Sequence, residues 1–198
     1  MSAANTLVFI TSANCVKSDI VRYMAAVKGI EFVALDAGSP AAIKLAKTLG
    51  ITEFPAVIER ALIVSEFDLI VEFIEERYPE PALFPADATS RAMVRTTMRR
   101  LHAETFPLLP AAVTGCAISR AQLESDLAAL DQMVYGCKYF GSVSFGCMDI
   151  NLVPFLHAAL QAGMVTDKFR NLRTYAEIHI QTTEFKSSLP SSDDALAA

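Results

Sequence analysis

Cys15 is the residue whose type and position are best suited to chemistry, within the segment Cys15-Val16-Lys17-Ser18. A thiol just before a helix is favoured as the thiolate, because the helix N-terminus attracts negative charge, and the Lys17 ammonium adds to that attraction. This spacing predicts a nucleophilic cysteine, with the Ser18 hydroxyl as a weaker accessory group. The alternative is a loop cysteine without chemistry, since most cysteines are not nucleophiles.

A second candidate site lies in the stretch 53–68, where Pro55 precedes a predicted hairpin. The apolar runs 56–58 and 61–64 predict two antiparallel strands around a tight reversal. A proline that opens a strand is either an edge proline or part of a cis-proline turn. An S-x-x-D pattern follows at Ser65, which predicts a helix that starts there and is capped by side chains.

Regular elements of both kinds must position these residues. Short apolar runs predict strands over 7–10 and 31–35. Helical periodicity with a terminal glycine predicts helices over 18–28 and 40–49, and a third helix covers 65–77. With the hairpin, the order is βαβαββα. Strands joined through a helix are expected to be parallel.

A cluster of prolines then interrupts the chain at Pro79, Pro81 and Pro85. Prolines at this density stop a helix and stiffen a short connection, so they mark a domain boundary. Beyond them the pattern is helical throughout. The predicted helices span 89–104, 119–135, 149–162 and 167–183.

Two domains therefore follow from the pattern, the first α/β and the second all-α. The predicted parts are a first domain at 1–78, a proline-rich linker at 79–88, an all-helical domain at 89–185 and a flexible tail at 186–198.

Composition argues against several function classes. The net charge of −5 disfavours direct DNA binding. No apolar run reaches the roughly 18 residues of a membrane span, and the first residues do not resemble a signal peptide, so we expect a cytoplasmic protein with no membrane segment. The four cysteines lack C-x-x-C spacing and the three histidines are scattered, so no metal site is expected.

Short motifs along the whole chain form a recognisable set. They are Val21-Arg22, Phe54-Pro55, Glu66, Tyr78-Pro79-Glu80-Pro81 and Gly146-Cys147-Met148-Asp149. Together they resemble the glutathione transferase superfamily. That resemblance implies an α/β thioredoxin-like N-terminal domain plus an all-α C-terminal domain. It also implies that Pro55 is cis and that Asp149 caps a buried helix, although Gly146 stands where a serine or threonine is usual.

The resemblance identifies Phe54, Pro55, Glu66 and Phe67 with a glutathione site. Transferases hold the γ-glutamyl end of glutathione with a Glu/Gln-Ser pair, and Phe67 here replaces the hydroxyl donor. Cys15 resembles the active cysteine of cysteine-type transferases. A glutathione-dependent thiol transferase or glutathione S-transferase that uses Cys15 is therefore one hypothesis.

The other hypothesis is a non-catalytic regulator without a cofactor. The reversal 58–62 and the segment 17–22 resemble the stringent starvation protein A family, which includes macrophage growth locus protein A. That resemblance implies a transcription regulator that associates with bacterial RNA polymerase. Its contact surface would be Tyr78, Pro79, Glu80 and Pro81, with Glu80 in place of a histidine. The alternative is a linker that prolines merely stiffen.

Two charged stripes suggest a dimer, an acidic one on the predicted helix 65–77 and a basic one on the predicted helix 89–104. Transferase-like dimers bring these two regions together across the two-fold axis. We therefore expect the stripes to pair between subunits of a homodimer or of a heterodimer with a paralogue. Exposed ion pairs add only about 0–1 kcal/mol each, so apolar burial would carry the dimer. The alternative is two solvated faces. The stripes are Glu72, Glu75 and Glu76 in one helix and Arg91, Arg95 and Arg99 in the next.

Overall fold

The computed structural model describes residues 7–190, which form two compact units. The first unit contains residues 7–81 together with a helix at 183–188, and the second contains residues 82–182. The first boundary lies between Pro81 and Ala82, in the proline-rich segment. The second boundary differs from the prediction, because the chain returns to the first unit after residue 182.

A four-stranded sheet forms the centre of the first unit, in the order β2-β1-β3-β4. The strands are β1 (Leu7–Thr11), β2 (Phe32–Asp36), β3 (Ala56–Glu59) and β4 (Leu62–Val64). β1 is parallel to β2 and antiparallel to β3, and β3 and β4 form an antiparallel hairpin. The tight reversal uses Arg60 with a positive φ of 54°. The predicted βαβαββα order and strand directions are confirmed.

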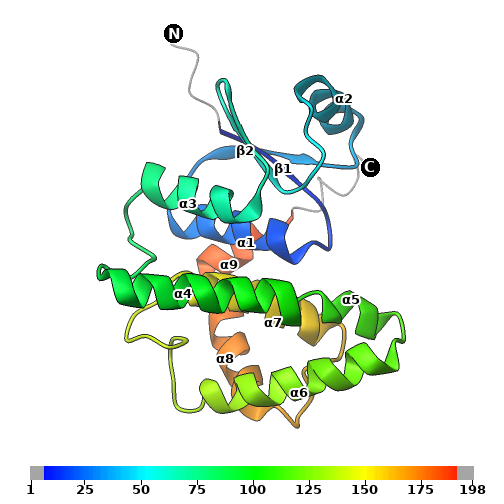
Figure 1. The fold of residues 1–198 in the computed structure, drawn as a ribbon, viewed down its shortest axis with the longest axis vertical. Helices are drawn as coiled ribbons and strands as arrows, with labels where there is room; N and C mark the ends of the chain where they lie inside the picture. The colour runs from blue at the N-terminus through cyan, green and yellow to red at the C-terminus, as the bar shows by residue number, and fades with distance from the viewer. Residues whose placement is uncertain (1–6, 191–198) are drawn as a thin grey trace. The chain divides into compact units, whose positions relative to one another are not determined.

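Three helices cover the sheet: α1 (Val16–Val27), α2 (Pro40–Leu49) and α3 (Phe67–Arg77). Figure 1 shows α1 and α3 on one face and α2 on the other. Ser39 caps α2 by accepting a hydrogen bond from the Ala42 amide at 3.2 Å. The predicted helix start at Ser65 is wrong, because α3 begins two residues later with Glu66 as its N-cap, in extended conformation and with no capping side-chain bond.

The second unit is helical, as predicted, with one more helix than expected among the described residues. α4 (Ala88–Arg100) continues into a π-helical turn at Leu101–Thr105, and together they fill the predicted helix 89–104. The unexpected helix is α5 (Leu108–Val113), which contains a proline. The remaining helices are α6 (Ala117–Met133), α7 (Cys147–Gln161) and α8 (Arg170–Ile180).

Asp149 anchors the start of the buried helix α7. Its carboxylate accepts hydrogen bonds from the Gly146 amide at 2.9 Å, from the Phe140 amide at 2.8 Å and from the Tyr175 hydroxyl. A buried carboxylate is costly unless it is paired or hydrogen-bonded, and three donors meet that need. The Gly146 position is tight, because a Cβ there would lie 3.0 Å from the Leu83 carbonyl oxygen.

The last described helix, α9 (Thr183–Ser188), corrects the predicted tail at 186–198. Phe185 is buried and packs edge-on against the Tyr23 ring of α1, with ring centroids 5.1 Å apart. Residues 186–188 therefore belong to an ordered helix of the first unit. The rest of that prediction, beyond residue 190, lies outside the described residues.

Candidate functional site

The sheet brings the ends of two strands to one edge in the first unit. Ile10, near the end of β1, pairs with Ala56, the first residue of the antiparallel strand β3. The loop that leads to Cys15 therefore leaves the sheet at the edge where Pro55 enters it. The Phe54–Pro55 peptide bond is cis, as the family resemblance implied.

Cys15 is the N-cap of α1 and is half-buried. Its backbone carbonyl accepts the first helical hydrogen bond, from the Asp19 amide at 3.0 Å. Within residues 7–190 its thiol makes no capping hydrogen bond to the helix. Cys15 therefore stands at the N-terminus of a helix, where the sequence places it, and its reactivity stays a prediction.

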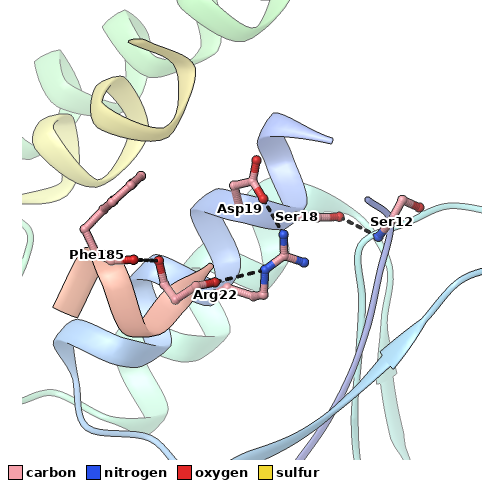
Figure 2. A network of polar contacts seen from close by, with 6 residues as sticks. Ser12, Ser18, Asp19, Arg22 and Phe185 are labelled. Carbon is pink, nitrogen blue, oxygen red and sulfur yellow. Dashed lines mark hydrogen bonds and ion pairs between the residues drawn. The ribbon is translucent and has the colours of Figure 1, made fainter. Parts of the chain in front are cut away.

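Ser18 has a structural role, and its predicted accessory role stays a prediction. Its buried hydroxyl accepts a hydrogen bond from the Ser12 amide at 3.0 Å, which ties the loop to α1 (Figure 2). That bond fixes the path of the chain that leads to Cys15.

Arg22 links the first turns of α1 to α9. Its guanidinium forms an ion pair with Asp19, and its Nε donates to the Ser188 carbonyl at 3.2 Å (Figure 2). Burial raises the pKa of the Asp19 carboxyl above 3.8, its ordinary value, and the Arg22 charge opposes that rise in part. The position that the family pattern marks with arginine is therefore a brace between helices.

Phe67 is the first residue of α3. The ring is only 8% exposed, and the Lys17 ammonium lies over it, 5.6 Å from the ring centroid. This cation–π contact joins the N-termini of α1 and α3. Glu66 is exposed and makes no capping bond within the described residues.

These residues fit glutathione only in part. The family resemblance places a peptide-like ligand beside Pro55, and the Phe54–Pro55 bond is cis here too. The γ-glutamyl side does not fit, because Phe67 offers no hydroxyl and is packed under Lys17. Losing a hydrogen bond to a charged group costs about 1.5–3 kcal/mol.

The Tyr78–Pro81 segment ends α3 and lies on the surface of the first unit. The Tyr78 amide donates to the Ile74 carbonyl at 3.0 Å, and Pro79, Glu80 and Pro81 are exposed. The Glu80–Pro81 bond is also cis. Sequence reasoning missed the group that holds this segment, Lys28, whose side chain is fully buried beneath it.

The predicted dimer residues differ in their surroundings. Glu75 forms an ion pair at 2.8 Å with Lys28 of its own unit, so one of its carboxylate oxygens is engaged within that unit. Glu76 is exposed and Glu72 is half-buried.

The arginine stripe lines a groove of about 490 Å³ along α4, with alanines between the guanidinium groups. Arg91 donates to the carbonyls of Pro85 and Ala86, and the Arg95 guanidinium lies 5.4 Å from the Phe84 ring centroid. Arg95 and Arg99 are exposed.

The second unit also contains a cavity of about 420 Å³ that the sequence did not indicate. Its walls come from the segment 82–85, from α4, from the loop 140–146 and from the start of α7. The aromatic residues that line it, Phe84, Phe140 and Phe145, lie in loops, where no periodicity marks them.

Residues 7–190 contain no group of three or more histidine, cysteine, aspartate or glutamate side chains placed to hold a metal ion. Over the same residues, no helix combines the length and the apolar character needed to cross a membrane.

Known proteins resemble this chain in sequence or in fold. A stringent starvation protein A homologue from Histophilus somni is 28% identical over 141 residues, which cover 68% of this chain and 66% of that protein. A glutathione S-transferase from Methylobacillus flagellatus with glutathione bound has a TM-score of 0.81 at 20% identity, over 94% of this chain and 100% of that one. The chain has the glutathione transferase fold and resembles stringent starvation protein A.

Enzymes of this fold are also similar in sequence. Maleylacetoacetate isomerase from Pseudomonas aeruginosa is 27% identical over 195 residues, which cover 86% of this chain and 89% of that enzyme. The matches to the first three curated relatives span about half to two thirds of their length, at 66%, 54% and 50%. No protein-family model matches the chain.

Proposed function

We propose that this protein is a non-catalytic regulator with the glutathione transferase fold that associates with bacterial RNA polymerase. The observation that carries the proposal is Phe67, which is buried under Lys17 where a transferase needs a hydroxyl. A chain that has lost this donor has lost much of its affinity for glutathione. The similarity to stringent starvation protein A homologues supports the regulatory role.

The surface that we assign to polymerase is Tyr78, Pro79, Glu80 and Pro81. Its prolines and glutamate are exposed, so a partner can reach them. DNA contact would be indirect, through polymerase, which agrees with the net charge of −5.

A thiol transferase that uses Cys15 is the second candidate. It is favoured by the position of Cys15 at the N-terminus of α1 and by the cis-Pro55 turn. Similarity to maleylacetoacetate isomerase and to glutathione-bound structures supports it as well.

Two measurements separate the candidates. The first is thermal unfolding with millimolar glutathione, combined with a thiol–disulfide exchange assay of wild type and Cys15→Ser. We expect no shift and no exchange activity that depends on Cys15. Clear stabilisation by glutathione, with activity that the Cys15→Ser variant loses, would overturn the regulator.

The second measurement is capture of purified RNA polymerase by the wild-type protein and by Glu80→Ala. We expect the wild type to retain polymerase and the variant to retain less. Equal capture by both proteins would remove the Tyr78–Pro81 surface from the proposal, and no capture by either would remove polymerase.

A further inference from the structure

Lys28 occupies an unusual place beneath the Tyr78–Pro81 surface. It caps the C-terminal end of α1, yet its side chain is 0% exposed. The ammonium lies 2.6 Å from the Tyr78 carbonyl oxygen, 2.8 Å from the Pro81 carbonyl oxygen and 2.8 Å from a Glu75 carboxylate oxygen.

The three contacts account for the whole ammonium group. Two of its three N–H donors have carbonyl acceptors, and the third contact is an ion pair with Glu75. Burying a charge is costly unless it is paired and hydrogen-bonded, and Glu75 supplies the opposite charge. The two carbonyls come from either end of one short turn, so a single cation fixes both ends of that turn.

The same contacts determine what the turn can offer to a partner. Pro79 and Pro81 have no N–H, and the Tyr78 amide is used by α3. The carbonyls of Tyr78 and Pro81 are used by Lys28. With these backbone groups engaged, we expect a partner to recognise mainly the proline rings and the exposed carboxylate of Glu80, in the arrangement that Lys28 imposes.

We propose that Lys28 is a positioning residue for the Tyr78–Pro81 surface: its buried ammonium holds the turn in the one shape that the partner recognises. The partner role of this clamp rests on the proposed function, whereas its effect on the turn does not. A turn that is ordered before binding saves the cost of ordering it in the complex.

The variant Lys28→Met tests the clamp, because it keeps an unbranched side chain of nearly the same length and removes the cation. Lys47→Met is the matched control, since Lys47 is an exposed lysine in α2. Amide hydrogen exchange of residues 76–84 measures the turn, and the dissociation constant for purified RNA polymerase measures the surface. We expect faster exchange and about tenfold weaker binding in Lys28→Met, and neither change in the control.

Glu75→Gln provides a milder variant should Lys28→Met not fold. It keeps an acceptor for Lys28 but removes the opposite charge, so we expect a smaller rise in exchange at the same residues. Unchanged exchange in every folded variant would overturn the clamp. Faster exchange with unchanged polymerase affinity would overturn the positioning role. A wild type that does not bind polymerase overturns the proposed function and the positioning role together, while the exchange data still decide whether Lys28 fixes the turn.

Discussion

The Lys17 ammonium lies 5.6 Å from the centroid of the Phe67 ring, one residue at the start of α1 and the other at the start of α3. The contact covers the ring that stands where the family resemblance implies a glutathione-binding hydroxyl. It therefore joins the two helix starts between which we expect a transferase to bind its ligand. The remaining parts, Cys15 and cis-Pro55, are the elements that the fold itself positions.

Restoring the hydroxyl should restore ligand binding. We expect Phe67→Ser to gain glutathione affinity, because it adds the missing donor and removes the ring under Lys17. One hydrogen bond to a charged group is worth about 1.5–3 kcal/mol, or about ten- to a hundredfold in affinity. Isothermal titration calorimetry with glutathione measures the gain.

Phe67→Ala is the matched control, because it opens the same space without a hydroxyl. The serine variant should bind glutathione more tightly than the alanine variant. Equal binding by the two variants, or none by either, would show that Phe67 does not decide glutathione recognition.

Asp19 predicts a specific pH dependence. Burial raises the pKa of its carboxyl in the folded protein above 3.8, the ordinary value that applies to the unfolded chain. At a pH between 3.8 and the raised pKa, the folded state therefore binds more protons than the unfolded state. The free energy of unfolding then falls as the pH rises through the folded pKa. This contribution is fully present below 3.8 and is lost above the raised pKa.

Comparison with Asp19→Asn isolates this contribution, since the amide oxygen can still accept from Arg22. The difference in unfolding free energy, wild type minus variant, should decrease as the pH rises from about 4 to neutrality. Urea unfolding at a series of pH values measures it. A difference that grows with pH would mean that the ion pair with Arg22 outweighs burial.

The helical periods and terminators of the first unit made most of its elements predictable. The helix 40–49 is an example, because proline begins it and Gly50, with φ 69°, ends it. The S-x-x-D pattern predicted a helix start at Ser65, but the helix begins at Phe67, whose side chain is buried. The helix 108–113 was missed because Pro107 and Pro110 lie in it or beside it, where prolines usually mark loops.

The candidate site was harder to predict, because its decisive contacts join residues far apart in the chain. Lysines are almost never fully buried, and nothing in the sequence around Lys28 marks it as an exception. Its three partners, Glu75 and the carbonyls of Tyr78 and Pro81, come together only when α1 and α3 have packed. Phe185 was likewise assigned to the all-helical domain, because nothing local shows that its ring packs against Tyr23 of the first unit.

Gly146 should not tolerate a side chain. A Cβ there would lie 3.0 Å from the Leu83 carbonyl oxygen, which accepts a hydrogen bond from the Cys147 amide at 2.8 Å. We expect Gly146→Ala to lower the free energy of unfolding by about 1–3 kcal/mol, the usual cost of overpacking. Chemical denaturation checks this, with the exposed residue Ser144 changed to alanine as the control.

Gly146→Ser sets the clash against a possible gain in stability. Serine is a usual cap in the family that the chain resembles, and it would add a hydrogen bond to the first turn of α7. The clash should outweigh the cap, so the serine variant should also be less stable than wild type. A more stable serine variant would mean that the segment 82–85 moves aside at little cost.

The charged stripes should pair across a dimer interface. Because Glu75 is engaged with Lys28, we expect Glu72 and Glu76 to be the acidic partners of the arginine stripe. We expect wild type to be a dimer at micromolar concentration. Changing Arg95 and Arg99 together to glutamate should weaken the dimer about tenfold, because two exposed pairs of about 0–1 kcal/mol each become repulsive.

Sedimentation equilibrium gives the dimer dissociation constant, and Arg120→Glu, at an exposed position on α6, is the control for the change in net charge. Adding Glu76→Arg to the double variant should recover part of the affinity, because it restores opposite charges across the interface. A monomeric wild type, or a double variant that dimerises as well as the control, would place both stripes on solvated faces.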